Sequence, residues 1–137
     1  PQKARAVIGY DESLAHQIEA GSDLFLMPSK FEPCGLNQMY SMAYGTPPIV
    51  RATGGLADSV IGATSETLAN GTATGFSFHD HEPDQFWQQL DWSLTLFADK
   101  PAWRRVQQAG MSRDWSWSRS AREYVALYEK ALARRSN

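Results

Sequence analysis

The residues best placed for chemistry lie between Pro28 and Asn37. Glu32 stands in a segment with two prolines and a glycine, which must be a loop, and it precedes Gly35 by three residues. A carboxylate on a loop between a buried strand and a helix can point into a cleft, and a glycine lets backbone approach a ligand closely. The segment therefore predicts a loop that brings one charged side chain and bare backbone to a bound molecule.

The helix that follows this loop is expected to begin at the turn from Gly35 through Leu36 to Asn37. The first N–H groups of a helix have no acceptor inside the helix, and the helix dipole makes that end positive. Such a turn is suited to a phosphate or to electron-rich sugar hydroxyls. An exposed loop carboxylate followed by an ordinary helix start is the alternative that these residues alone leave open.

The elements around the loop have the order strand, helix, strand, loop, helix, strand. Apolar runs and helical periodicity predict strands at Ala6–Tyr10, Leu24–Met27 and Pro48–Arg51, and helices at Glu12–Ala20 and Leu36–Tyr44. This order is typical of an α/β fold with a doubly wound parallel sheet, in which ligands bind outside the carboxyl ends of the strands. The ends of the three strands should therefore share one edge.

The rest of the chain is expected to become helical after a weaker middle. The predicted elements are a helix Leu56–Ile61, a polar stretch Gly62–Thr74, a strand Gly75–Phe78, and helices at Pro83–Asp99, Pro101–Met111 and from Trp117 or Ser120 onward. The last helix has capping-box spacing at Ser120 and Glu123. It is expected to bury one stripe of side chains, made of Tyr124, Val125, Tyr128 and Leu132, and to be partly detached from the sheet and its other helices.

Composition limits the chain to one globular core. At 137 residues with 42% apolar residues it is short for a two-domain enzyme with a cleft between domains. No apolar run approaches the roughly 20 residues that span a bilayer, and the first residues lack the order of a signal peptide, so no membrane partner is expected. The single cysteine, Cys34, cannot form an internal disulfide, which suits the reducing cytoplasm.

Charge is distributed unevenly along the chain. Residues 1–99 carry four Lys or Arg and twelve Asp or Glu, a net charge of −8, and residues 100–137 carry nine and three, a net charge of +6. The basic residues alternate with apolar ones at helical spacing. This pattern favours a solvated helix face, able to dock on an acidic surface, over a nucleic-acid site.

Other residues that could do chemistry have simpler interpretations. His79-Asp80-His81 lacks further ligands nearby, and helix capping by Asp80 or Glu82 explains it, so neither a metal nor a cofactor is predicted. Cys34 has no histidine near it in sequence, which favours a lining residue over a nucleophile. The five tryptophans lie among apolar neighbours on helices, which favours core or interface positions over a strip that stacks on glycans.

Several segments together resemble one known family. Pro28–Tyr40, Tyr44–Pro47 and Arg51–Asp58 look like the signature of ADP-glucose-dependent glycogen and starch synthases, and Asp114–Trp117 with Ser120–Tyr124 is similar to that family's last helix. The resemblance covers nearly all of the chain. It implies a two-domain GT-B glycosyltransferase built from Rossmann-like domains. Residues 1–137 would be the C-terminal portion of its donor-binding domain, with an α/β part at 1–78 and a helical part with a C-terminal tail at 79–137.

The resemblance also implies an activity, retaining glucosyl transfer from ADP-glucose to the non-reducing end of an α-1,4-glucan. The N-terminal domain and the residues that hold the diphosphate would lie upstream, so this chain alone is expected to be inactive. It is also expected to self-associate through an unpaired sheet edge. The rival interpretation is a non-catalytic module that binds a nucleotide or a glucan.

Roles for individual residues follow from the same resemblance. Glu32 would accept hydrogen bonds from glucose hydroxyls and balance positive charge at the anomeric carbon, and Tyr10 would stack on adenine. Tyr40 stands where related transferases carry a second glutamate that binds the ribose. The remaining residues expected at the sugar-donor site are Cys34, Gly35, Leu36 and Asn37, with backbone N–H groups for sugar and phosphate, and Thr53 and Gly54, which line it.

Overall fold

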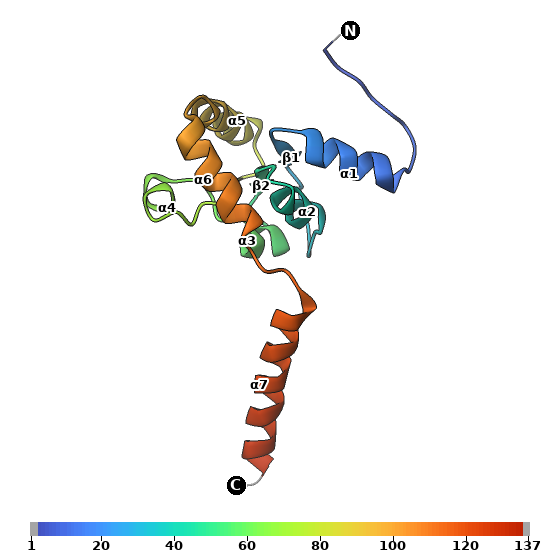
Figure 1. The fold of residues 1–137 in the computed structure, drawn as a ribbon, viewed down its shortest axis with the longest axis vertical. Coiled ribbons are helices and arrows are strands. Elements are labelled where there is room, and N and C mark those ends of the chain that lie inside the picture. Colours follow the sequence, from blue (N-terminus) through green and yellow to red (C-terminus); the bar gives the residue numbers. More distant parts are fainter. Residues whose placement is uncertain (1–2, 136–137) are drawn as a thin grey trace.

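A computed structural model describes residues 3–135 of the chain (Figure 1). Its strands are β1 (Phe25–Met27), β2 (Pro48–Arg51) and β3 (Phe76–Phe78). Its helices are α1 (Glu12–Gly21), α2 (Asn37–Ala43), α3 (Gly55–Ser59), α4 (Ser65–Ala69), α5 (Pro83–Ala98), α6 (Lys100–Met111) and α7 (Trp117–Arg135). The strands form one sheet in the order β1-β2-β3, and both pairings are parallel. The predicted α/β class with a parallel sheet flanked by helices is confirmed.

One face of the sheet is covered by α5 and α6. Successive side chains of a strand point to opposite faces, so Ile49 of β2 and its register partner Phe76 of β3 point the same way. Both are fully buried with Trp103 of α6, whose ring lies 5.9 Å from that of Phe76. Phe97 of α5 meets Trp103 edge-on at 5.1 Å. These aromatic contacts hold the α5–α6 pair against the sheet.

The opposite face is covered by α2 and α3. Val50, which follows Ile49 on β2, packs there with Met42 of α2 and Leu56 of α3, and all three are buried. Helix α6 also reaches α2 at Gly110, where an added Cβ would lie 3.4 Å from the Met42 side chain. The sheet is therefore buried on both faces, as expected of apolar parallel strands.

The predicted strand Ala6–Tyr10 does not form. Residues 4–10 are irregular and exposed, and the Ile8 and Tyr10 side chains are 103% and 94% exposed. In the described residues this segment makes no backbone hydrogen bond to β1, and Figure 1 shows it extending away from the sheet beyond α1. A short apolar run becomes a strand only where it pairs with another strand, so β1 is an edge of this sheet.

The predicted polar stretch Gly62–Thr74 contains a helix, α4. Its start has a reciprocal cap in which the backbone N–H of Thr67 donates to the Thr64 hydroxyl and the backbone N–H of Thr64 donates to the Thr67 hydroxyl. A capping box usually carries Glu or Gln at the third helical position, so threonine at that position conceals the signal in the sequence.

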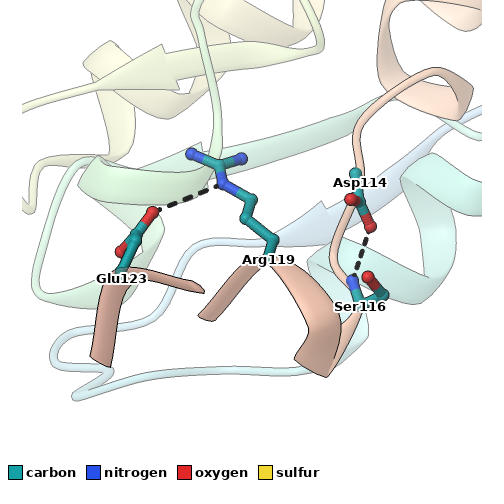
Figure 2. A network of polar contacts seen from close by, with 4 residues as sticks. All are labelled: Asp114, Ser116, Arg119 and Glu123. Atoms are coloured by element: carbon teal, nitrogen blue, oxygen red, sulfur yellow. Dashed lines mark hydrogen bonds and ion pairs between the residues drawn. The ribbon is translucent and has the colours of Figure 1, made fainter. Parts of the chain in front are cut away.

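Helix α7 begins at Trp117, so the predicted capping box at Ser120 is wrong, because Ser120 lies inside the helix. The Asp114 carboxylate instead accepts a hydrogen bond of 2.9 Å from the backbone N–H of Ser116, just before the helix (Figure 2). Hydrogen bonds from the side chain and from the backbone N–H of Ser116 lower the pKa of Asp114 below its ordinary value. Figure 2 also shows the exposed ion pair between Arg119 and Glu123.

The stripe on α7 that was predicted to be buried is exposed. The helix projects away from the rest of the molecule (Figure 1), and its large apolar side chains are all more than half exposed. They include the predicted residues Tyr124, Val125, Tyr128 and Leu132. The helical spacing of the stripe was predicted correctly, but no described element of this chain covers it.

Candidate functional site

The loop between β1 and α2, residues 28–36, starts at the carboxyl end of β1 and so lies at the ligand-binding edge of the parallel sheet. Glu32 is half-buried in this loop. Among residues 3–135 no hydrogen bond or ion pair is made to its carboxylate. The Glu32 carboxylate therefore has no partner within the described residues, and its role at a ligand site stays a prediction.

The loop after β2 packs directly on the Glu32 loop. The backbone N–H of Gly55 donates to the carbonyl oxygens of Glu32 and Pro33, at 3.2 Å each. Gly54 has φ +46°, and a Cβ on it would lie 2.1 Å from the Glu32 carbonyl oxygen. A Cβ on Gly55 would lie 2.3 Å from the carbonyl oxygen of Cys34. Only glycine at both positions permits this approach.

Gln38 supports the same loop from the side of α2, a role that was not predicted from the sequence. Its side chain is fully buried, and Nε2 donates to the carbonyl oxygens of Cys34, at 3.2 Å, and Gly35, at 3.0 Å. Nε2 also donates to the Ser59 hydroxyl, which in turn donates to the carbonyl oxygen of Gly55. Gln38 follows Gly35 by three residues and Cys34 by four, a spacing at which a side-chain amide can hydrogen-bond the backbone carbonyl groups. This spacing was the local signal that could have revealed the role of Gln38.

The turn predicted to bind anions is present. Gly35 has φ +73°, a left-handed conformation that favours glycine, and α2 begins two residues later at Asn37. In the described part of the chain the backbone N–H groups of Gly35, Leu36 and Asn37 have no acceptor. Cys34 and Asn37 are exposed, and Leu36 is 54% exposed. The turn thus presents unpaired hydrogen-bond donors beside Glu32.

A second group of predicted residues lines a hollow between α1 and α2. The hollow measures about 390 Å³, and its walls include Tyr10, Asn37 and Tyr40. Tyr40 is 41% exposed, and its ring lies 5.4 Å from that of His16. Asn37 also belongs to the turn beside Glu32, so the two groups meet at the start of α2. Tyr10 reaches the hollow from the irregular segment before α1 and not from the end of a strand.

The same hollow has a buried carboxylate at its wall. Glu19 of α1 is 7% exposed, and its Oε2 atom has no hydrogen-bond partner among residues 3–135. Burial raises the pKa of Glu19 above its ordinary value, and the charge of His16 offsets part of this rise. Glu19 was not predicted from the sequence.

The residues around His79 form a structural turn. The Gln85 side chain accepts from the backbone N–H groups of His79 and Asp80 and donates to the Asp80 carboxylate. Glu82 precedes α5 but makes no cap hydrogen bond, so the predicted capping by Asp80 or Glu82 is wrong. Residues 3–135 contain no cluster of His, Cys, Asp and Glu that could hold a metal ion.

The tryptophans divide between the core and the surface. Trp92, Trp103 and Trp115 pack in the two cores, whereas Trp87 and Trp117 are 66% and 85% exposed.

Among the described residues, no helix combines the length and the apolar character needed to cross a membrane.

The fold and the sequence together assign the chain to one protein family. The family model of the glycosyl transferases group 1 matches residues 4–107, and the chain belongs to that family. Its parallel sheet and flanking helices are those of the C-terminal domain of a GT-B glycosyltransferase.

Within the family the chain is related to glycogen and starch synthases. It is 56% identical over 129 residues to the glycogen synthase of Hydrogenovibrio crunogenus, which covers 94% of this chain and 26% of that protein. It is 54% identical over 136 residues to the glycogen synthase of Dechloromonas aromatica, covering 99% of this chain and 28% of that protein. The chain thus spans about a quarter of the length of these curated relatives.

A solved structure gives the same relationship. The catalytic domain of Starch Synthase IV from Arabidopsis thaliana, bound to ADP and acarbose, matches with a TM-score of 0.82 and 40% sequence identity. The match covers 94% of this chain and 26% of that one.

Proposed function

We propose that the protein containing this chain is a glycogen synthase that transfers glucose from ADP-glucose, with retention of configuration, to the non-reducing end of an α-1,4-glucan. In this reaction the bond from the anomeric carbon to the diphosphate breaks, a bond to the acceptor hydroxyl oxygen forms, and ADP and the hydroxyl proton leave. The observation that carries the proposal is the placement of Glu32 at the carboxyl edge of the sheet, with its carboxylate unpaired in residues 3–135 and backbone N–H groups beside it.

In this proposal Glu32 acts on the sugar. Positive charge develops at the anomeric carbon when the bond to the diphosphate lengthens, and a fixed carboxylate in a closed cleft stabilises that charge. The loop around Glu32 is held by Gly55 and Gln38, so the carboxylate needs little reorganisation. Such fixed groups contribute more to the transition state than to ground-state binding.

The residues next to Glu32 bind the rest of the sugar donor. The N–H groups of Gly35, Leu36 and Asn37 serve sugar and phosphate oxygens, since they have no acceptor among residues 3–135. Thr53 and Gly54 line the site from the loop after β2. Cys34 is an exposed lining residue.

The hollow between α1 and α2 is proposed to receive the nucleoside. Tyr10 stacks on adenine, which an aromatic ring does without reading base-specific hydrogen bonds. Tyr40 lines the same hollow and takes the place of the ribose-binding glutamate of related transferases.

The N-terminal domain of the same enzyme is the remaining partner. It would bring the glucan acceptor, and the lysine and arginine that hold the diphosphate would lie upstream in the donor-binding domain, so this chain alone is inactive. We place the enzyme in the cytoplasm, where the exposed thiol of Cys34 stays reduced.

The test is Glu32→Ala in the full-length enzyme. Loss of one charged group in a closed cleft is worth on the order of 2–4 kcal/mol, so kcat should fall about thirtyfold to a thousandfold. ADP affinity should change little, because ADP lacks the glucose on which Glu32 acts. The measurements are steady-state transfer to glycogen and calorimetric ADP binding. Near-normal turnover would remove Glu32 from the mechanism.

Tyr10→Ala is the matched variant for the nucleoside hollow. Stacking on the base is similar in the ground and transition states, so the KM for ADP-glucose should rise and kcat should change less. An unchanged KM together with unchanged ADP affinity would contradict the stacking role. If the full-length protein bound ADP but transferred no glucose, the non-catalytic module would be the better interpretation.

A further inference from the structure

Arg51, the last residue of β2, makes three side-chain hydrogen bonds at the carboxyl edge of the sheet. Its Nε donates to the carbonyl oxygen of Ser29 at 3.2 Å, and one terminal nitrogen donates to the carbonyl oxygen of His79 at 3.1 Å. The other terminal nitrogen donates to the carbonyl oxygen of Lys30. All three acceptors are backbone atoms, and the Arg51 side chain is half-buried among them.

These contacts join the ends of all three strands. Ser29 and Lys30 follow β1, His79 follows β3, and Arg51 itself ends β2. In parallel strands these ends lie at one edge, and that edge carries Glu32. Arg51 forms no ion pair with a carboxylate of residues 3–135, so its charge is directed at backbone carbonyl oxygens.

We propose that Arg51 is a positioning residue for the catalytic carboxylate of Glu32, an inference that rests on the function proposed above. The loop is held on the far side of Glu32 by the N–H of Gly55 and by Gln38. On the N-terminal side of Glu32, Arg51 holds the loop through the carbonyl oxygens of Ser29 and Lys30, three and two residues before Glu32. Without Arg51 the N-terminal side of the loop is free to shift.

The guanidinium group suits this role, and lysine does not. Its donors are fixed in a plane and point in several directions, so one side chain reaches acceptors on two loops. A lysine ammonium would keep the positive charge, but a single nitrogen cannot span the same carbonyl oxygens. Arg51→Lys therefore removes the geometry and retains the charge.

A displaced loop should affect turnover more than binding of the sugar donor. A shift of about 1 Å in a catalytic group costs on the order of a hundredfold in rate. In the full-length enzyme we expect Arg51→Met and Arg51→Lys each to lower kcat about tenfold to a hundredfold. The KM for ADP-glucose and the Kd for ADP should change by less than about threefold, because the nucleoside hollow lies on α1 and α2.

The decisive experiment is a double-mutant cycle between Arg51→Met and Glu32→Ala, read as kcat for transfer to glycogen. If Arg51 acts through Glu32, Arg51→Met should lower kcat further by less than about twofold once Glu32→Ala is present. A purely structural role would lower kcat in both backgrounds to the same extent. Arg104→Met, at an exposed arginine of α6, is the matched control and should leave kcat unchanged.

Each result of the double-mutant cycle either supports or overturns the positioning role of Arg51. Full additivity in the cycle overturns the role of Arg51 and leaves the proposed function standing, provided that Glu32→Ala alone is impaired. If Glu32→Ala alone retains turnover, both the catalytic role of Glu32 and the positioning role of Arg51 fail. Circular dichroism and the Tm identify any variant that does not fold. If Arg51→Met does not fold, the same cycle with Arg51→Lys tests the positioning role.

Discussion

The backbone N–H of Gly55 donates to the carbonyl oxygen of Glu32 over 3.2 Å and so joins the loops after β2 and β1. The approach is close because neither Gly54 nor Gly55 has a side chain. The position of Glu32 thus depends on residues that never contact its carboxylate.

Gly54→Ala should destabilise the chain more than a positive φ alone explains. Gly54 has φ +46° and ψ −134°, a backbone conformation that is unfavourable for alanine, and an alanine Cβ would also lie 2.1 Å from the Glu32 carbonyl oxygen. Gly71→Ala is the matched control, since Gly71 has φ +74° with nothing within 4 Å. Urea denaturation should show a clearly larger loss of unfolding free energy for Gly54→Ala. Equal losses would show that the loop moves aside at no cost.

Phe76→Ala should remove much of the stability of the chain. Phe76 of β3 is fully buried with the Trp103 ring stacked on it, and removing a buried phenylalanine typically costs about 3–5 kcal/mol. Trp87→Ala removes a ring that is 66% exposed and should cost much less. Unfolding free energies from urea titration provide the comparison. Similar losses for the two variants would contradict the assignment of the core.

Glu19 should make stability fall as pH rises. Burial raises its pKa in the folded state above the ordinary 4.5, so between 4.5 and the folded-state pKa the folded chain holds a proton that the unfolded chain releases. Stability is therefore greatest below this window and decreases through it. Glu19→Gln removes the titration, so the unfolding free energy of the variant should rise relative to that of the parent chain as pH increases from about 4.5. Denaturation at several pH values gives this difference, and a constant difference would contradict the prediction.

The isolated chain should self-associate. Strand β1 is an edge of the sheet with Leu26 47% exposed, and Tyr124 and Tyr128 of α7 are 56% and 60% exposed. Sedimentation velocity should show larger species as concentration rises.

Replacing both tyrosines by serine should raise the concentration at which association begins by about tenfold or more, since 1.4 kcal/mol corresponds to tenfold in affinity. Lys130→Ser on the same helix is the control and should have little effect. A monomer at every concentration would contradict the expectation for the parent chain.

Most elements of the fold could be predicted because their signals are local. The apolar runs at residues 24–27 and 48–51 became strands within one residue of the predicted bounds. Pro83 stands at the first position of α5, where its missing N–H costs no hydrogen bond. Gly45, with φ +79°, follows α2 closely and permits the turn toward β2.

Two of the errors fall where a partner decides the structure. The segment 6–10 is as apolar as the strands that did form, but pattern alone cannot say whether a neighbouring strand is present. The stripe on α7 has the right period, yet burial needs an opposing surface.

The sequence by itself determined the family and the parallel α/β order, and it indicated Glu32 and its glycine-rich neighbours as a candidate site, because residue type and spacing along one segment carry those signals. The tertiary structure alone decided how Glu32 is held. Arg51 and Gly55 reach its loop from the end of β2, and Gln38 reaches it from α2 with Ser59 behind it. A hydrogen bond between residues far apart in the chain depends on where the sheet returns the backbone, and no local pattern encodes that return.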